Sequence, residues 1–244
     1  MIISHQHRFI FIKTQKTAGT SVEVLLSDII EDAAVVTPVQ PPVEGHRPRN
    51  FTSTGRISVD ASATLRSGAR RLRSLVTRTP FRPDLAFYNH MPATRVIEQV
   101  GRRTWDSYLT FTFERNPWDK VASAFFWQRG GEADPEDFRA WVASRAPAST
   151  RIYSVAGTLP VDFPRYSLDG RTIGVDLVGR FEHLADDLQS VLDQVGLAGA
   201  ELPRSKSGTR PTIPLRDLYD DETAERVAVA FSKEIDTFGY SFPE

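Results

Sequence analysis

A short, wholly apolar run near the start of the chain constrains the fold more than any other feature. Phe9-Ile10-Phe11-Ile12 is rich in β-forming residues and shows no polar–apolar alternation, as is typical of a strand buried on both faces of a parallel sheet. A polar loop containing Gly19 follows, with Thr20 or Ser21 as the predicted helix N-cap. Apolar residues then recur at helical spacing, at Val22, Leu25, Leu26 and Ile29. The chain therefore opens with a strand, a loop and a helix.

The same arrangement recurs twice further along the chain. Residues 108–113 predict a strand that ends in Glu114-Arg115-Asn116-Pro117, and Pro117 suits the first turn of a helix. Residues 175–178 predict another strand, followed by a helix over 184–195 that Gly196 closes. This alternation predicts a three-layer α/β fold, in which helices flank a central, mainly parallel sheet. Further expected elements are a strand at 35–36 and helices at 92–101, 134–143 and 227–238.

The segment from about residue 40 to 85 differs in composition from the rest. It is rich in proline and carries six arginines between Arg66 and Arg82, which predicts an irregular insertion with one helix near 61–75. We expect these arginines to lie on a solvated helix face. The alternative is a surface that receives an anionic glycan. With this insertion, residues 1–244 are expected to form a single domain.

Composition excludes several classes of function. The chain has no cysteine, so disulfides, thiolate metal sites and a cysteine nucleophile are ruled out. Its net charge of -1 gives no general attraction to nucleic acid. No apolar run approaches the roughly 20 residues of a membrane span, and the start lacks the features of a signal peptide. We therefore expect a cytoplasmic protein, with no metal site because no ligand cluster is visible in the sequence.

The loop after the first strand has the chemistry of an anion site. At a strand-to-helix turn, free backbone N–H groups converge and the helix dipole favours negative charge. Lys16 adds a cation, Gly19 allows close backbone approach, and Thr17, Thr20 and Ser21 add hydroxyl donors. The order Gly-Lys-Ser/Thr of nucleoside-triphosphate loops is absent, because here the lysine precedes the glycine. This departure disfavours a P-loop kinase or GTPase.

Two motifs together resemble the sulfotransferases that use 3′-phosphoadenosine 5′-phosphosulfate (PAPS) to modify carbohydrates. Lys16-Thr17-Ala18-Gly19-Thr20-Ser21 is similar to their 5′-phosphosulfate loop, and Phe113-Glu114-Arg115-Asn116-Pro117 through Phe125 is similar to their 3′-phosphate motif. The resemblance implies the P-loop-like sulfotransferase fold and sulfuryl transfer to a hydroxyl, or less readily an amine, of a carbohydrate or related small molecule. The product would be adenosine 3′,5′-bisphosphate, with no metal required.

The resemblance also implies roles for individual residues. Thr17, Ala18, Gly19, Thr20 and Ser21 would cradle the 5′ end, with Lys16 at the leaving oxygen. Arg115 and Ser123 would bind the 3′-phosphate, because arginine offers phosphate a charge-assisted fork. His90, just before a predicted helix, resembles the base of several family members and has a suitable pKa class. Asp84 is the alternative base.

Several roles stay open at this stage. Lys13 either faces the cofactor or simply ends the strand. Lys206 and Arg210, in a late basic loop, either close over the 3′-phosphate or lie in a solvated turn. Trp118 and Trp127 are expected to pack in the core, although Trp127 has an alternative place near the acceptor. The competing functions are a P-loop nucleotide kinase and a nucleotide-binding module without turnover.

Overall fold

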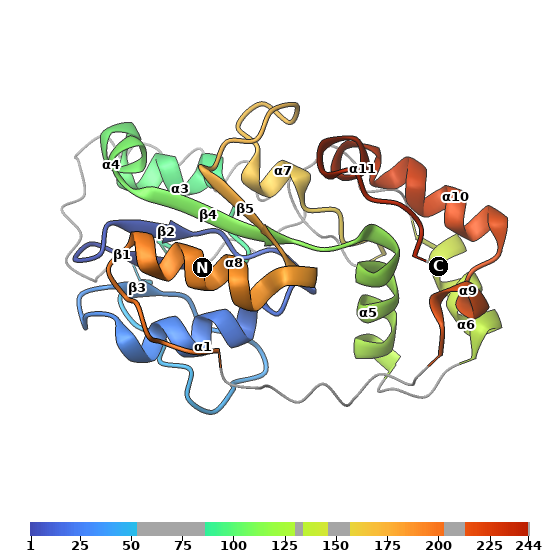
Figure 1. Cartoon of the computed structure of the whole chain (residues 1–244), viewed down its shortest axis with the longest axis horizontal. Coiled ribbons are helices and arrows are strands. Elements are labelled where there is room, and N and C mark those ends of the chain that lie inside the picture. Colours follow the sequence, from blue (N-terminus) through green and yellow to red (C-terminus); the bar gives the residue numbers. More distant parts are fainter. Residues whose placement is uncertain (53–85, 130–133, 146–156, 203–212, 244) are drawn as a thin grey trace.

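A five-stranded mixed sheet lies at the centre of the molecule, in the order β3-β1-β2-β4-β5 (Figure 1). The computed structural model describes residues 1–52, 86–129, 134–145, 157–202 and 213–243. The strands are β1 (Ile2–Ser4), β2 (Phe9–Phe11), β3 (Val35–Val36), β4 (Leu109–Glu114) and β5 (Leu177–Arg180). Strand β2 pairs with β4 and β4 with β5 in parallel, whereas β1 pairs with both β2 and β3 in antiparallel. The carboxyl ends of β2 and β4 therefore meet at one edge of the sheet.

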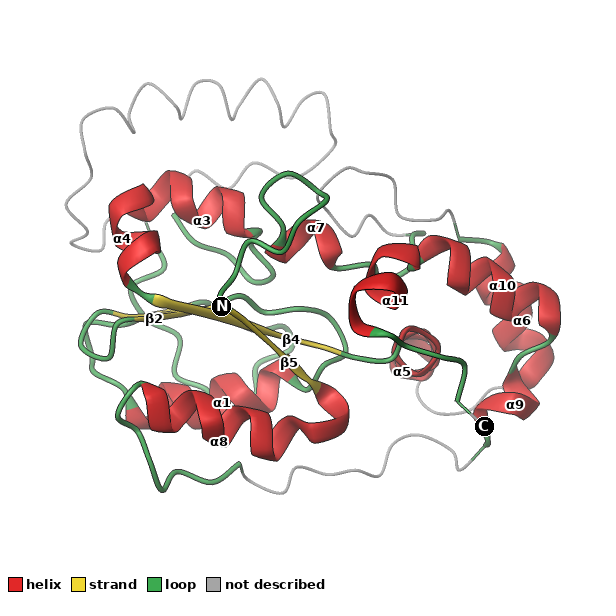
Figure 2. Cartoon of the chain, turned by 45° about the horizontal axis from the view of Figure 1, so that its top comes forward, coloured by secondary structure: helices red, strands yellow, loops and turns green. Residues whose placement is uncertain are grey.

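Helices cover both faces of this sheet (Figure 2). On one face lie α1 (Gly19–Ile29) and α8 (Leu184–Gln194), the latter preceded by the 3-10 turn η1 (Phe181–His183). Their apolar sides pack on one core cluster that includes Phe11, Phe111 and Leu188. On the other face lie α3 (Ala93–Val100), α4 (Arg102–Ser107) and α7 (Phe163–Tyr166), over a second core cluster.

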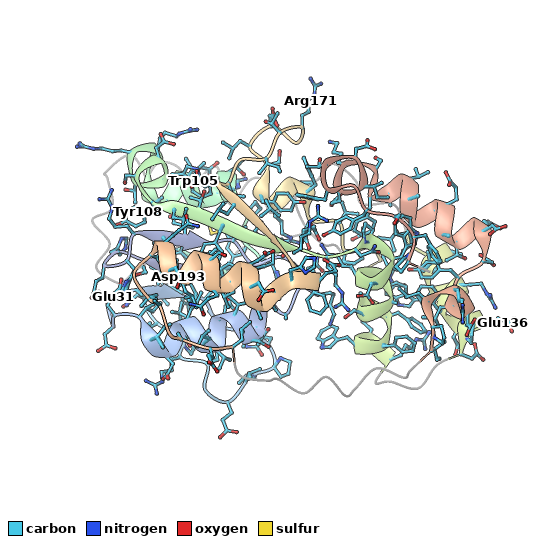
Figure 3. All side chains as sticks on the ribbon, viewed as in Figure 1. Glu31, Trp105, Tyr108, Glu136, Arg171 and Asp193 are labelled. Carbon is cyan, nitrogen blue, oxygen red and sulfur yellow. The ribbon has the colours of Figure 1, made fainter. Side chains whose placement is uncertain are left out.

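A separate group of helices stands beyond the carboxyl end of β4 (Figure 1). It comprises α5 (Pro117–Arg129), α6 (Pro135–Ala143), α9 (Leu215–Leu218), α10 (Asp221–Ala230) and α11 (Ser232–Phe238), around a third, aromatic-rich cluster. The loop between α7 and β5 leads away from this group, and its Arg171 side chain points away from the body (Figure 3). Helix α5 continues directly from β4, so it carries the sequence after Arg115 into the helical group.

The predicted α/β class and most of its elements are confirmed. The strands after residues 8 and 107 and the helices that follow them lie where the sequence places them. Helix α6 begins after Asp134, whose side chain accepts a hydrogen bond from the Asp137 amide at 2.8 Å. Five of the described elements were not predicted, namely β1, α4, α7, η1 and α9. The predicted last helix is divided into α10 and α11 at Phe231, which is fully buried.

One predicted segment falls outside the described ranges. The helix expected near 61–75 and the basic stretch at 66–82 lie outside the described residues. Arg180 donates to the carbonyl of Phe238 at 2.6 Å and so ties β5 to the end of α11. In the described ranges, no helix combines the length and apolarity that crossing a membrane requires.

Candidate active site

The two predicted phosphate motifs touch each other. Because β2 and β4 are parallel neighbours, the loop after β2 and the turn after β4 leave the same edge of the sheet. The Arg115 Nη1 atom donates to the Lys16 carbonyl oxygen at 2.9 Å, across 99 positions of sequence. The Thr14 hydroxyl also donates to the Phe113 carbonyl at 2.5 Å. The two loops therefore form one surface rather than two separate turns.

The backbone of the first loop is held in an uncommon conformation. Lys16 (φ 58°) and Ala18 (φ 57°) are both left-handed although neither is glycine, and such positions cluster at functional sites because they store strain. Helix α1 begins at Gly19 after Ala18, and no side chain caps it. The predicted N-cap at Thr20 or Ser21 is therefore wrong, because both residues already lie inside the helix. An uncapped first turn suits an incoming anion.

Lys16 places an ammonium group beside an exposed aromatic ring. Its Nζ atom lies 4.9 Å from the ring centroid of Trp127 on α5. Among the described residues it has no hydrogen-bond or ion-pair partner. Burial, and secondarily the positive charge of Arg115, lower the pKa of Lys16 to about 8. Trp118 is buried as expected, but Trp127 is 64% exposed, so its predicted core position is wrong.

Lys13 lies beneath the loop instead of facing outward. Its Nζ atom pairs with Glu23 at 2.6 Å and donates to the Thr20 hydroxyl at 3.1 Å. A side chain at Gly19 would come within 2.8 Å of the Lys13 Cγ atom, so this glycine is needed for packing over Lys13. Thr17 is likewise buried, with its hydroxyl 2.9 Å from that of Thr14. These contacts favour the reading in which Lys13 ends the strand and supports the loop.

Arg115 is fixed before any ligand binds. Its guanidinium donates to the Asp119 carboxylate at 2.6 and 2.7 Å and lies 3.8 Å above the Phe181 ring. A guanidinium has five N–H donors in a rigid fork, so a phosphate can add to these contacts. Ser123 follows two helical turns along α5 and is half-buried. Arg115 thus lies in the turn before α5, and Ser123 lies within that helix.

His90 lies against the first loop, just before α3. Its Nδ1 atom is 3.1 Å from the Lys13 carbonyl, and because a carbonyl only accepts, Nδ1 carries the proton and Nε2 is left as the basic nitrogen. The residue is left-handed (φ 58°), like Lys16 and Ala18. Burial, followed by the charges of Arg165 and Lys13, lowers the pKa of His90 to about 3. The imidazole is therefore neutral near pH 7.

A buried charge network behind these loops was missed in the sequence. Lys120 on α5 pairs with Glu114 at 2.5 Å and with Asp162 at 2.9 Å, and all three side chains are fully buried. Arg165 pairs with Asp162 and donates to the His90 carbonyl. No local pattern could reveal this network, since its members come from β4, α5 and the segment around α7.

Three further predicted residues fall where the structure gives no description. Lys206, Arg210 and the alternative base Asp84 lie outside the described residues. Within the described ranges, no group of three or more metal-ligating side chains is close enough together to hold an ion.

The chain is similar to an archaeal relative and to a bacterial protein of known structure. A protein from Archaeoglobus fulgidus, described as uncharacterized, is 34% identical over 110 residues, which are 44% of this chain and 83% of that protein. A crystal structure of a sulfotransferase from Alicyclobacillus acidocaldarius aligns over 96% of both chains, with a TM-score of 0.41 and 19% identity. No family model matches the sequence.

Proposed function

We propose that this chain, which belongs to one family with the archaeal relative, is a sulfotransferase that uses PAPS as its sulfuryl donor. The observation that carries the proposal is the contact between Arg115 and the Lys16 carbonyl. It brings the 5′-phosphosulfate-like loop and the 3′-phosphate-like motif together, as one bisphosphate nucleotide would require. The uncapped start of α1 and the ammonium of Lys16 supply the local positive field that the net charge of the chain lacks.

The residues of the site divide the proposed reaction between them. PAPS would supply an activated sulfuryl group, whose bond to the phosphate oxygen breaks as the acceptor oxygen bonds to sulfur. Lys16 would stabilise the negative charge on the leaving oxygen, a role worth roughly 3 kcal/mol for one fixed donor. His90 would take the acceptor proton at Nε2. The start of α1 with Thr20 and Ser21 would hold the 5′ end, and Arg115 with Ser123 the 3′-phosphate.

The low pKa of His90 is compatible with a base once the donor is bound. In the free protein the charges of Arg165 and Lys13 oppose protonation of the ring. A bound phosphosulfate brings negative charge to the same loop, which raises the pKa toward the working range. The proposed acceptor is a hydroxyl of a carbohydrate or related small molecule, with an amine as the less favoured alternative.

Thermal unfolding with matched nucleotides tests the proposal directly. Adenosine 3′,5′-bisphosphate at 100 times its Kd should stabilise the protein by about 2.7 kcal/mol, which raises the Tm by several degrees for a chain of this size. Adenosine 5′-monophosphate, which lacks the 3′-phosphate, should give a smaller shift. Stabilisation by ATP with Mg²⁺ but not by the bisphosphate would instead identify a kinase-like protein. Binding without transfer to any member of a broad acceptor panel would favour a module without turnover.

The affinity for adenosine 3′,5′-bisphosphate should depend on pH through Lys16. Below pH 8 Lys16 is already protonated in the free protein, so the affinity should be constant. As the pH rises through about 8, binding must take up a proton, and the affinity should fall by up to roughly tenfold per pH unit. Titration calorimetry from pH 7 to 9.5 measures this slope. The Lys16→Arg variant is the control, because a guanidinium stays charged and should give a flat profile.

A further inference from the structure

The carboxylate of Asp162 contacts residues that hold Lys16, His90 and Arg115 in place. Asp162, on the segment that leads into α7, is fully buried. One of its oxygens accepts from the Gln15 amide at 2.7 Å and pairs with Lys120 at 2.9 Å, and the other pairs with Arg165. Because a buried carboxylate needs several donors to stay ionised, these contacts hold Asp162 in one position.

Each donor leads directly to a part of the candidate site. Gln15 precedes Lys16, so the hydrogen bond of the Gln15 backbone N–H holds the chain just before the left-handed backbone of Lys16. Arg165 donates to the carbonyl of His90, whose own ring is tied to Lys13. Lys120 also pairs with Glu114, which accepts from the Arg115 amide at 2.9 Å. Within the described residues, the links from Asp162 run through Gln15 to Lys16 and through Arg165 to His90, and through Lys120 and then Glu114 to Arg115.

We infer that Asp162 is a positioning residue, which sets the backbone at Lys16 and at His90 relative to each other through Gln15 and Arg165. The effect on catalysis rests on the proposed function, which gives Lys16 and His90 their roles. In-line transfer requires the leaving oxygen and the attacking acceptor oxygen, whose proton His90 takes, to lie on opposite sides of the sulfur, so the spacing between Lys16 and His90 matters. A displacement of about 1 Å from a change outside the reacting groups can cost on the order of 100-fold in rate.

Three substitutions separate positioning from simple stability. Asp162→Asn keeps the size of the side chain but removes the charge that holds both Gln15 and Arg165. Arg165→Lys keeps a cation for Asp162 but loses the planar fork that reaches both Asp162 through Nε and the His90 carbonyl through Nη1. Tyr166→Phe is the matched control. It removes a buried hydroxyl that donates to Glu114 at 3.1 Å, from the same network, without touching Gln15, Asp162 or His90.

We expect the three variants to differ in kcat and in bisphosphate Kd. Asp162→Asn should lower kcat by roughly 10- to 100-fold and also weaken bisphosphate binding, because the loop of Lys16 is released. Arg165→Lys should lower kcat by a similar factor with bisphosphate Kd unchanged, because only His90 is released. Tyr166→Phe should change neither, although it lowers the Tm. Folded Asp162→Asn and Arg165→Lys variants with wild-type kcat and Kd would overturn the inference, as would a Tyr166→Phe variant that loses as much kcat as they do.

Two readouts without turnover keep this test separate from the proposed function. Hydrogen exchange at the Gln15 amide should be faster in Asp162→Asn than in Tyr166→Phe. NMR of the His90 ring should show the Nδ1-protonated tautomer in the wild type and a shifted ring environment in Arg165→Lys. If wild-type protein binds no bisphosphate, the proposed function fails, while these two measurements still decide whether Asp162 and Arg165 hold the two backbones. If Asp162→Asn does not fold, Arg165→Lys compared with Tyr166→Phe decides the matter.

Discussion

Replacing His90 with asparagine is expected to lower kcat by roughly 10²- to 10⁴-fold, the range for loss of one general base. Asparagine is the informative substitution for two reasons. Its side-chain amide can still donate to the Lys13 carbonyl, as Nδ1 of His90 does at 3.1 Å, and it tolerates the left-handed backbone of this position (φ 58°). Bisphosphate affinity and Tm should therefore stay near those of the wild type.

The pH profile of the wild type provides the second half of this test. The value of kcat/KM for PAPS reports the free protein, in which the pKa of His90 is about 3. It should therefore show no acid limb near pH 6.5, where an unperturbed histidine base would become protonated. Initial rates at limiting PAPS from pH 5 to 8 measure this profile. Near-full turnover in His90→Asn with intact binding would remove His90 from the mechanism.

The sequence predicts those parts of the molecule that depend on local pattern. The apolar runs of β2 and β4, and the prolines at the starts of α3 and α5, each specify an element through nearby residues alone. Strand β1 was missed because three residues carry little pattern, and only pairing with β2 and β3 makes them a strand. The same reason explains α7, a four-residue helix in a proline-containing segment.

In the candidate site too, the sequence predicts local motifs but not contacts between side chains that are distant in sequence. The motifs indicated that Lys16 and Arg115 belong together, and adjacent parallel strands bring their loops into contact. The sequence could not show that Lys13 would form an ion pair with Glu23. That pairing depends on which side of the sheet the Lys13 side chain faces at the end of the strand. Asp162 gave no signal at all, since an aspartate before a proline-containing turn is usually solvated.

Replacing Lys120 with methionine should cost about 3–5 kcal/mol of unfolding free energy, the range for breaking a buried ion pair from one side. The methionine fills most of the same space, but the carboxylates of Glu114 and Asp162 then lose the ammonium that lies between them. Total stability is usually about 5–15 kcal/mol, so the variant should be marginal. Urea unfolding measures the loss. Arg102→Met is the control, since its exposed pair with Asp106 should contribute no detectable change in midpoint.

The loss of unfolding free energy in Lys120→Met should also depend on pH, because Glu114 titrates. Burial already raises the pKa of this carboxyl to about 7 in the wild type, against the opposing charge of Lys120. A raised pKa means that its contribution to stability is complete below the unfolded value near 4.5 and is lost as the pH rises through the folded value. Without Lys120 the pKa of Glu114 in the folded protein rises further, so the unfolding free energy of the variant should be closer to that of the wild type at pH 5 than at pH 8.

A second substitution tests whether Glu114 is responsible. Adding Glu114→Gln to Lys120→Met should restore part of the stability at pH 8 and little at pH 5. Equal losses at both pH values would show that Glu114 does not carry the uncompensated charge.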